Sequence, residues 1–410
     1  MNILFLTQIV PFPPDAGPKV KTYHVLRALA EQGHSITLVS FVRSEEMSQI
    51  AGLSTLCAEI HSVPLQRSRL ADAWYLIRSY LTKRPFMVER DDLSPMQRLV
   101  NRLVRERRFD VIHADQLTMV QFGLRGAAAC SPGKKPRVIF DAHNAVWTIV
   151  ERVQHNMPWF LKPVVGIEAR RLKHYEGELL KKVDHVLAVT QIDADYLKQA
   201  LPSANGKHRG RVSPITVVPI AVDTRHIYPI HRSPHSNHIV TLGTLHYPPN
   251  ADGIRWFLTD LFPIIRQHIP TAALTVIGKN PPPDFLSAEA RHPESIRVTG
   301  YVPELVSFFE KSAVMVVPVR AGGGMRVRIL EAFAYGMPVV TTTVGLEGID
   351  AVPGEDVLVA DSSQDFARTV VELLENSLLQ QKLSVNGRRL AETKYDWQVA
   401  LAPMKTLYDV

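Results

Sequence analysis

The sequence predicts an α/β protein built from two doubly wound domains, each a parallel sheet covered by helices on both faces. Three observations carry this prediction. Short apolar runs typical of buried strands alternate with helical stretches along most of the chain. The order strand, Pro-rich loop, helix, strand begins at residue 2 and begins again at residue 238. Between the two halves, residues 223–237 are rich in His, Pro and Ser without an apolar period, which is typical of a linker.

The first half, residues 1–222, is expected to form one domain. Asn2–Gln8 is an apolar run, a Pro/Gly loop follows it, and the next helical pattern ends at Gly33. A second strand at His34–Phe41 completes a βαβ unit, whose crossover is right-handed. Four further buried strands are predicted at Val111–Ala114, Arg137–Asp141, Val186–Thr190 and Ile215–Pro219.

The second half, residues 238–389, repeats the pattern. In doubly wound sheets ligands bind at the carboxyl ends of the strands, so we expect the two domains to face each other across a ligand-binding cleft. Residues 390–410 are predicted to be helical, with an apolar stripe that either caps the second domain or crosses back to the first. The predicted elements are strands at His238–Leu245, Ala272–Gly278, Ala313–Val319 and Pro338–Thr343, and helices at Ile254–Ile269 and Met325–Tyr335.

The composition is that of an ordinary globular protein. Of 410 residues, 46% are hydrophobic and 21% charged, which excludes a disordered or fibrous chain. The two cysteines, Cys57 and Cys130, match neither a disulfide framework nor a zinc site and fit a reducing compartment. The first apolar run is short and lacks a basic flank, and no other run approaches the ~18 residues of a membrane span. We therefore expect a cytoplasmic protein with, at most, peripheral contact with the inner face of a membrane.

The charge is unevenly distributed. The net charge of +7 divides into +10 for residues 1–222, with 30 basic and 20 acidic side chains, and −3 for residues 223–410, with 17 and 20. Residues 67–108 hold 11 basic and 5 acidic side chains beside several aromatic ones, on helices expected at Leu70–Leu81 and Pro95–Arg107. This combination suits an anionic membrane surface beside a lipid-linked acceptor, although two ordinary amphipathic surface helices would give the same pattern. The residues expected at such a surface are Trp74, Arg78, Lys83 and Arg84.

Nucleic acid is not expected as a partner, because the sequence contains no motif for binding it and the overall charge is modest.

One stretch combines features of an anion-binding site. Three successive glycines, at 322–324, follow a predicted strand and precede a helix, so the backbone can approach a ligand and helix N–H groups can point at it. Arg326 and Arg328 lie in the first turn of that helix, where positive charge opposes the helix dipole. An anionic ligand would explain them; the alternative is that both are solvated or paired with acids. Glu331 could accept hydrogen bonds from two sugar hydroxyls or form a salt bridge to a nearby arginine.

This stretch resembles the C-terminal signature of the group 1 (family 4) glycosyltransferases, which have the GT-B fold. Their signature is a Glu-x7-Glu motif in a strand, Gly-rich loop, helix, strand unit, and Glu331 in ILEAFAYGMPVV matches its second Glu. The opening PFPPDAGPKVKTYHVLRALAEQGHSITLVS and the segment TGYVPE at Thr299–Glu304 are similar to the family's N-terminal and base-binding regions.

The resemblance implies a reaction. A sugar would pass from a nucleotide-sugar donor, UDP- or GDP-linked, to a hydroxyl of a lipid-linked or saccharide acceptor, in the assembly of cell-surface polysaccharide or glycolipid. The family retains the anomeric configuration and requires neither a metal nor a further cofactor.

The resemblance also implies roles for residues of the second domain. Tyr301 or the backbone of Val302 would hold the base, and Glu331 would hold the ribose hydroxyls. The residues implied around the diphosphate are Gly243, Thr244, Asn250, Gly323, Gly324, Arg326 and Arg328.

In the first domain, Gly17 matches the family's flexible glycine loop under the reactive end of the donor, although an ordinary β–α turn would look the same. Lys19 and Lys21 follow it and could reach an anionic acceptor. His143 ends a strand and resembles the family's cleft histidine, which contacts the donor sugar and the reaction centre. Gly17 and His143 are therefore the catalytic candidates. His113 also ends a strand, and a hydrogen-bonded structural histidine is the simpler interpretation for it.

The sequence departs from the family pattern at two places. The first Glu of the motif is replaced by Gly323, and the usual Arg and Lys after the first strand of the C-terminal domain are missing, with Thr244 at the Arg position. A buried diphosphate without cations would be very costly. Our hypothesis is that Arg326 and Arg328 supply the lost charge from another loop. A sublineage of the family with a PPN loop and a GGGxR loop resembles this arrangement.

The hypothesis predicts that Arg326→Ala weakens binding of the donor, measured by calorimetric titration. An unchanged affinity would contradict the compensation.

Three other functions compete with the transferase. Sugar-nucleotide epimerases share the fold, but the chain resembles them much less. A phosphorylase would need a pyridoxal-binding lysine, and no lysine of the C-terminal half lies in the glycine-rich stretch. A non-catalytic nucleotide-sugar sensor or partner subunit is supported by Gly323 and the missing Arg/Lys pair alone.

Overall fold

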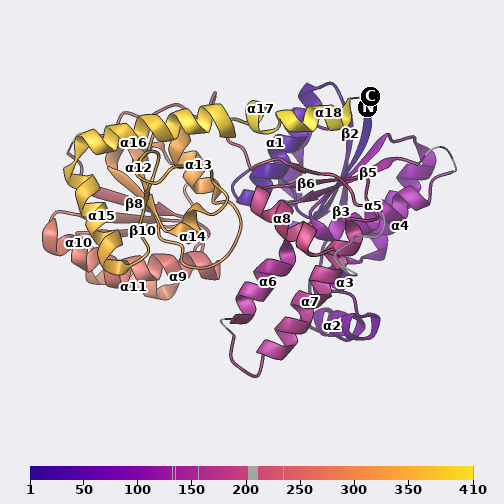
Figure 1. The fold of residues 1–410 in the computed structure, drawn as a ribbon, viewed down its shortest axis with the longest axis horizontal. Coiled ribbons are helices and arrows are strands. Elements are labelled where there is room, and N and C mark those ends of the chain that lie inside the picture. Colours follow the sequence, from indigo (N-terminus) through magenta and orange to yellow (C-terminus); the bar gives the residue numbers. More distant parts are fainter. Residues whose placement is uncertain (132, 134, 156, 202–210, 234, 410) are drawn as a thin grey trace. The chain divides into compact units, whose positions relative to one another are not determined.

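The computed structural model describes residues 1–410 except 132, 134, 156, 202–210, 234 and 410. The chain divides into two compact units, Met1–Pro219 with Leu401–Val410, and Ile220–Ala400. Each unit contains one parallel sheet with helices packed against it (Figure 1). The predicted α/β fold with two doubly wound sheets is therefore confirmed.

The sheet of the first unit has seven strands in the order β3-β2-β1-β4-β5-β6-β7. The central strands are buried along nearly their whole length, as expected for parallel strands covered on both faces. The strands are β1 (Asn2–Thr7), β2 (Ser35–Val42), β3 (Glu59–Pro64), β4 (Val111–Asp115), β5 (Arg137–Ala142), β6 (His185–Ala188) and β7 (Ile215–Val217).

Helices of the first unit connect these strands, and two of them form a hairpin. In Figure 1, α6 and α7 lie side by side and run to a common tip away from the sheet. The helices are α1 (Gly17–Glu31), α2 (Arg69–Thr82), α3 (Phe86–Asp91), α4 (Ser94–Glu106), α5 (Val120–Ala128), α6 (Val146–His155), α7 (Lys162–Leu179) and α8 (Gln191–Gln199), with short 3-10 helices at Ser44–Leu53 and Leu117–Met119.

The sheet of the second unit has six strands in the order β10-β9-β8-β11-β12-β13. The strands are β8 (His238–Leu242), β9 (Ala273–Ile277), β10 (Ile296–Thr299), β11 (Val314–Val317), β12 (Val339–Thr341) and β13 (Leu358–Val359). The helices are α9 (Pro248–Trp256), α10 (Phe262–His268), α11 (Pro283–Arg291), α12 (Val306–Lys311), α13 (Val327–Ala334), α14 (Thr343–Leu346), α15 (Ser363–Glu375), α16 (Ser377–Leu390) and α17 (Trp397–Ala400).

One predicted helix differs in its bounds and regularity. The helix expected at Ile254–Ile269 begins earlier, at Pro248, and contains a π-helical turn at Phe257–Leu261 before α10. Proline suits the first turn of a helix, where an N–H group has no partner in any case, so the Pro-rich loop is in part the start of α9.

The expected linker is not a free connection. Ile230 N donates to the Tyr335 carbonyl at 3.0 Å, and Arg232 Nη1 donates to the Ala313 carbonyl at 3.1 Å. Residues 223–233 and 235–237 therefore belong to the second unit and are hydrogen-bonded to it. A linker composition gives no sign of such side-chain and backbone pairing at long range.

The C-terminal segment is not one continuous helix. After α16, a π-helical turn at Ala391–Tyr395, α17, a 3-10 turn at Ala402–Met404 and α18 (Lys405–Tyr408) follow one another. Pro403 accounts for one break, because proline lacks an N–H donor. The last ten residues belong to the first unit. There the hydroxyl of Tyr408 lies 2.6 Å from Nδ1 of His113, and both side chains are buried.

Glu176 connects the helices of the hairpin. Its carboxyl oxygens accept hydrogen bonds from the backbone N–H groups of Val146 and Trp147, both at 2.9 Å, at the start of α6. Burial raises the pKa of Glu176 to about 8, against the effect of these two hydrogen bonds, and Asp193 adds to the rise. The carboxyl group is therefore protonated more readily in the folded than in the unfolded chain.

This shift predicts a pH dependence of stability. Between the unfolded pKa near 4.5 and the folded pKa of about 8, the folded chain binds more protons, so the free energy of unfolding decreases as pH rises through this window. We expect Glu176→Gln to remove this decrease, which amounts to a few kcal/mol at about 1.4 kcal/mol per pKa unit. Urea titrations of both proteins at about pH 5 and about pH 8 measure it. Parallel pH profiles for the two proteins would contradict the prediction.

Candidate active site

Most residues singled out from the sequence follow the carboxyl ends of strands, within each unit separately. In the second unit they follow β8, β10 and β11; in the first they follow β1 and β5, while His113 lies within β4. A parallel sheet brings these ends to one edge, which is where ligands of doubly wound folds bind.

Arg328 brings a guanidinium group to the end of β8. It lies in the first turn of α13, and its Nη1 donates to the carbonyl of Leu242, the last residue of β8, at 2.5 Å. This is next to Thr244, where the family has its arginine. Burial and, to a smaller extent, the nearby Arg326 lower the pKa of Arg328 to about 10, with Glu331 opposing the change. The group remains charged at neutral pH, and a bound anion would stabilise that charge.

Gly243 makes room for this guanidinium. A Cβ atom on Gly243 would lie 2.1 Å from Nη1 of Arg328, which is closer than real Cβ contacts. The backbone N–H of Gly243 also donates to the Ile277 carbonyl at 3.0 Å, so the turn after β8 is held in place. A side chain at residue 243 would therefore displace the arginine rather than the backbone.

Arg326 takes a different position. Its Nη1 donates to the carbonyls of Gly323 and Gly324, at 2.6 Å and 3.0 Å, so the side chain folds back on the glycine-rich loop. Gly322 has a φ of +104°, a conformation that favours glycine, and would place a Cβ 3.5 Å from Pro249. The loop therefore lies beside the start of α9.

Thr244 and Asn250 belong to the turn between β8 and α9. Asn250 is buried, and its Nδ2 donates to the carbonyl of Thr244 at 3.1 Å. Asn250 therefore supports this turn, while Thr244 is half-buried at the edge of the sheet.

Glu331 and the segment after β10 complete this half of the site. Glu331 is half-buried on α13, and burial raises the pKa of its carboxyl, with Arg328 opposing the rise. Tyr301 is exposed, and the Lys279 ammonium lies 4.3 Å from the centre of its ring, while Val302 is half-buried. An open aromatic ring beside the backbone is suited to a flat base.

In the first unit, His143 is oriented by a buried carboxylate. Its Nε2 donates to Oδ1 of Asp115, the last residue of β4, at 2.7 Å. The other oxygen of Asp115 accepts from the hydroxyls of Thr7 and Thr22, at 2.9 Å and 3.0 Å. Asp115 was not among the residues singled out from the sequence, although its place at a strand end was a usable signal. Three groups from three elements, Asp115 of β4, Thr7 of β1 and Thr22 of α1, thus determine the direction of the imidazole ring.

Lys21 is not placed as expected. It is buried, with 1% of its surface exposed, and forms an ion pair with Asp141 at the end of β5. Burial alone would raise the pKa of Asp141, but Lys21 together with His113 and His143 outweighs that effect and holds this pKa well below its usual range. The expectation that Lys21 reaches an acceptor is therefore wrong for this conformation. Lys19 is half-buried and 3.7 Å from Asp15, and Gly17 begins α1.

His113 has the structural position that its simpler interpretation predicts. Its ring is buried, stacks on Phe5 with 4.2 Å between centroids and contacts Tyr408. Ligand atoms of His113, Asp115 and Asp141 lie within 4.8 Å of one another, as in some metal sites. The Lys21 ammonium already supplies the positive charge at Asp141, which favours an ion-pair cluster over a cation site.

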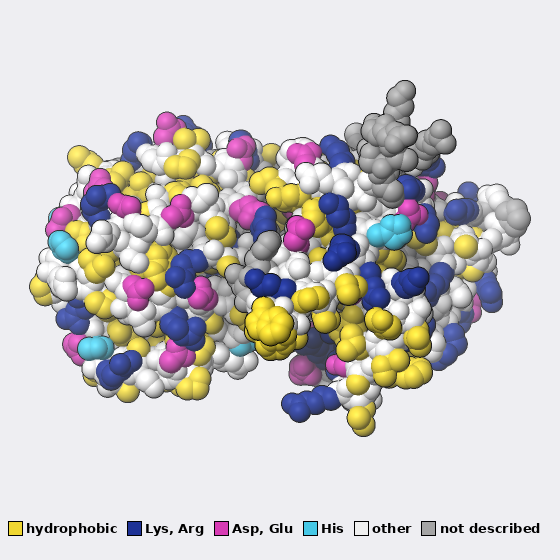
Figure 2. All heavy atoms as spheres, turned by 60° about the horizontal axis from the view of Figure 1, so that its bottom comes forward, with side chains coloured by type: hydrophobic (Ala, Val, Ile, Leu, Met, Phe, Trp, Pro, Cys, Tyr) yellow, Lys and Arg dark blue, Asp and Glu magenta, His cyan; other side chains and the backbone are white. Residues whose placement is uncertain are grey.

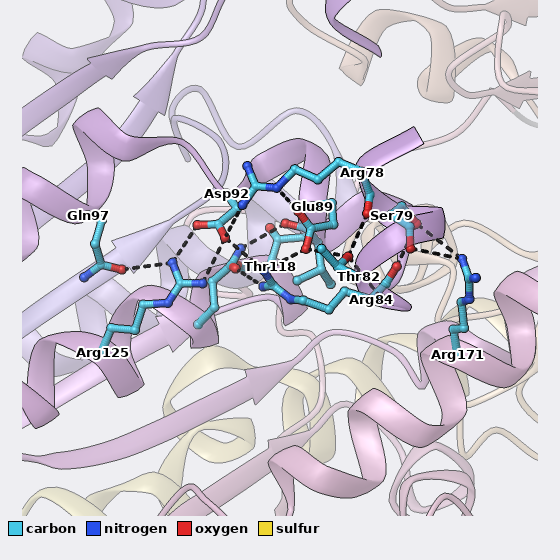
Figure 3. A network of polar contacts seen from close by, with 12 residues as sticks. Arg78, Ser79, Thr82, Arg84, Glu89, Asp92, Gln97, Thr118, Arg125 and Arg171 are labelled. Carbon is cyan, nitrogen blue, oxygen red and sulfur yellow. Dashed lines mark hydrogen bonds and ion pairs between the residues drawn. The ribbon is translucent and has the colours of Figure 1, made fainter. Parts of the chain in front are cut away.

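Two of the basic residues expected at a membrane surface are bound within the protein. Arg78 Nε lies 2.8 Å from Glu89, and Arg84 Nη1 lies 2.8 Å from Glu89 and 3.0 Å from Asp92 (Figure 3). Glu89 is fully buried, so these arginines neutralise a carboxylate and hold α2 against α3. By contrast, Trp74 and Lys83 are exposed.

Comparison with known proteins identifies the family. A model described as Glycosyltransferase Family 4 matches residues 17–226, and one described as Glycosyl transferases group 1 matches residues 236–376. The chain belongs to glycosyltransferase family 4. An uncharacterized 44.6 kDa protein in the cps region of Klebsiella pneumoniae is 24% identical over 170 residues, or 40% of this chain. The alignment spans 43% of that relative, which is less than half of its length.

Solved structures of low sequence identity share the fold of this family 4 glycosyltransferase. Anabaena HepE in complex with UDP-glucose is 14% identical, with a TM-score of 0.68 over the full length of both chains. A variant of TarM from S. aureus is 10% identical, with a TM-score of 0.69 over both full chains. WaaG, a glycosyltransferase involved in lipopolysaccharide biosynthesis, is 12% identical, with a TM-score of 0.63 over both full chains. The predicted GT-B fold is thus confirmed.

The contact between Gly243 and Arg328 leads to a prediction for nucleotide binding. We expect Arg328→Ala to weaken UDP binding about ten- to a hundredfold, since a hydrogen bond to a charged group contributes about 1.5–3 kcal/mol. Gly243→Ala should weaken it similarly, because the added methyl displaces the guanidinium. The double variant should bind no worse than Arg328→Ala alone.

Arg320→Ala is the matched control, because Arg320 is exposed and pairs with Asp252 in the same unit. Calorimetric titration with UDP measures all four variants. Additive losses for Gly243→Ala and Arg328→Ala would show that the two residues act independently.

Proposed function

We propose that this family 4 glycosyltransferase moves a sugar from a nucleotide-sugar donor to an acceptor hydroxyl, with retention of the anomeric configuration and without a metal. The observation that carries the proposal is the guanidinium of Arg328 at the end of β8, within 2.5 Å of the Leu242 carbonyl. It would supply a cation near the place where the family pattern has one and this sequence has Thr244.

The second unit is proposed to bind the donor. Arg328, Gly243 and the glycine-rich loop would face the diphosphate, Glu331 the ribose hydroxyls, and Tyr301 or Val302 the base. The raised pKa of Glu331 fits this role, because burial disfavours its charge until hydroxyl groups or Arg328 stabilise it. HepE was crystallised with UDP-glucose, so UDP-sugars are the first donors to test.

The chemistry would rest on charge stabilisation. As the glycosidic bond breaks, negative charge develops on the leaving diphosphate, and a guanidinium and backbone N–H groups already in place stabilise it more than the ground state. His143 would contact the donor sugar near the reaction centre. Its bond to Asp115 orients the ring before substrate binds, so that no reorientation is needed during the reaction.

The acceptor is proposed to be a lipid-linked or saccharide hydroxyl in cell-surface polysaccharide or glycolipid assembly. The cps-region location of the K. pneumoniae relative and the role of WaaG in lipopolysaccharide biosynthesis support this class.

A second candidate is a nucleotide-sugar sensor without catalytic activity. It is favoured by Gly323, because this residue has no carboxylate to offer the sugar where the family motif has its first Glu.

The test is turnover of a panel of UDP- and GDP-sugars by the purified protein. We expect slow hydrolysis of the correct donor, unaffected by EDTA. His143→Ala should lower kcat by about 10²–10⁴-fold with little change in UDP affinity, because the residue acts at the reaction centre rather than on the nucleotide. His268→Ala, an exposed histidine on α10, is the matched control.

Each outcome separates the two candidates. Nucleotide binding without turnover of any donor would support the sensor. Turnover that EDTA abolishes would overturn the metal-independent reaction, and full activity of His143→Ala would remove that residue from the site.

A further inference from the structure

Helix α2 has its polar and apolar sides reversed relative to an ordinary surface helix. Of its 14 residues only Ser79 is buried. Leu70, Trp74, Ile77 and Leu81 follow one another at helical spacing on one stripe, and between 54% and 87% of each side chain is exposed. A helix of a water-soluble domain normally turns such a stripe toward the core.

The polar side of α2 makes the contacts with the protein instead. Arg78 pairs with the buried Glu89, and the hydroxyl of Thr82 donates to Glu89 at 3.1 Å (Figure 3). Burial would raise the pKa of Asp92, but Arg125 and Arg84 outweigh it and lower that pKa. These ionised groups keep α2 attached by its charged face, so the apolar stripe is held outward.

The tip of the α6–α7 hairpin presents a second apolar group. Trp159 and Phe160 are 83% and 60% exposed, and Val164 and Ile167 continue the group along α7. Among the described residues, α2 and the segment from α6 to α7 hold 12 of the 22 large hydrophobic side chains that are exposed. Such a concentration marks an interaction surface rather than scattered exposure.

The two groups are joined by contacts between α2, α3 and α7. Arg171 on α7 donates to the carbonyl of Ser79 at 3.3 Å, and its guanidinium lies 5.7 Å from the centre of the Tyr80 ring. Glu168 accepts from the backbone N–H of Phe86 at 2.7 Å. Figure 2 shows hydrophobic side chains gathered on this side of the molecule, with Lys and Arg side chains beside them. We call these exposed side chains of α2 and the hairpin the apolar face.

Basic residues border the apolar face. Arg69 and Lys83 lie at the two ends of α2, and Lys162 and Arg170 lie on α7, all of them exposed. No acidic residue occurs in the sequence between Glu151 and Glu168, the stretch that forms the tip. An occupant of this face should therefore be apolar and bordered by negative charge.

We propose that the apolar face binds the surface of an anionic bilayer, with Trp74 and Trp159 at the level of the headgroups and the basic residues against lipid phosphates. Amphipathic aromatic residues flanked by Lys and Arg are suited to this interface. Insertion stays peripheral, because no helix within the described chain has the length and hydropathy to cross a bilayer. The proposal concerns where the protein binds and does not depend on the transfer reaction.

A second copy of the chain fits this face less well. In a two-fold dimer the same patch faces itself, so the basic border would meet an identical basic border across the interface. An anionic lipid surface complements both the apolar centre and its border.

The arginines that bind lipid are not those expected from the sequence. Arg78 and Arg84 are held by Glu89 and Asp92, so their role is to orient α2. The charged contact is made by Lys83, which was expected from the sequence, together with Arg69, Lys162 and Arg170.

Co-sedimentation of the full chain with vesicles tests the proposal. We expect binding to phosphatidylglycerol/phosphatidylethanolamine vesicles that weakens with added salt, and much weaker binding to phosphatidylcholine alone. Two double variants should each weaken binding at least about tenfold, because each removes two exposed apolar side chains from the bilayer contact. They are Trp159→Ser with Phe160→Ser, and Trp74→Ser with Ile77→Ser. Lys83→Glu with Lys162→Glu should weaken only the binding to anionic vesicles.

Leu378→Ser is the matched control, because Leu378 is 77% exposed but lies on α16 of the second unit. All variants change exposed side chains, and equal urea midpoints and equal UDP affinity show that the fold and the nucleotide site are intact.

Tryptophan fluorescence gives an independent measurement. The chain has five tryptophans, of which Trp147, Trp256 and Trp397 are buried, whereas Trp74 and Trp159 are 61% and 83% exposed. Brominated lipid in the vesicles should therefore quench the emission of these two residues, and Trp74→Phe with Trp159→Phe should abolish the quenching.

Three results would overturn the proposal. The first is absence of binding to the anionic vesicles. The second is equal loss of binding by Leu378→Ser and the surface variants. The third is a dimer of the free protein, seen in sedimentation, that the surface variants dissociate while vesicle binding stays unchanged, because the face would then be an interface between two copies.

Discussion

A charge that is removed from water must have a partner, and this constraint organises the first unit. Asp115, Asp141 and Glu89 are all fully buried, and each is neutralised or hydrogen-bonded by side chains outside its own helix or strand. The partner of Asp115 is His143, which the proposed reaction would need in one orientation. The partners of Glu89 are arginines that turn α2 to present its apolar side outward. Since removing one member of such a pair leaves a buried charge without compensation, these contacts hold their elements firmly in place.

In the second unit the same constraint applies to Arg328, whose partly buried guanidinium is hydrogen-bonded to a neutral carbonyl group. Arg328 has a carbonyl for a partner at the end of β8, and its pKa of about 10 shows that burial disfavours its charge. An anionic ligand would relieve this cost. The glycines around it serve the same arrangement, because Gly243 leaves space for the guanidinium and the carbonyls of Gly323 and Gly324 hold Arg326.

The sequence was informative wherever a local pattern determines the structure. Buried strands and the glycine-rich turn could be predicted because apolar runs and successive glycines have few alternative structures. Lys21 could not, since its burial depends on Asp141, which is 120 residues away. Arg78 and Arg84 look like ordinary surface charges for a different reason: their partner Glu89 is close along the chain, but the sequence pattern does not show that it is buried. The exposed tip at Trp159 was missed because an apolar run alone does not reveal whether it faces the core or the solvent.

The contact between His113 and Tyr408 has a consequence for biosynthesis. The first unit consists of Met1–Pro219 and Leu401–Val410, so the ribosome makes the whole of Ile220–Ala400 before the last element of the first unit emerges. The second unit is contiguous and can fold as soon as it is made. The first unit must wait with its buried histidine uncovered until the C-terminal residues arrive. The first unit can therefore be completed only after translation has passed Ala400 and the covering C-terminal residues have been made.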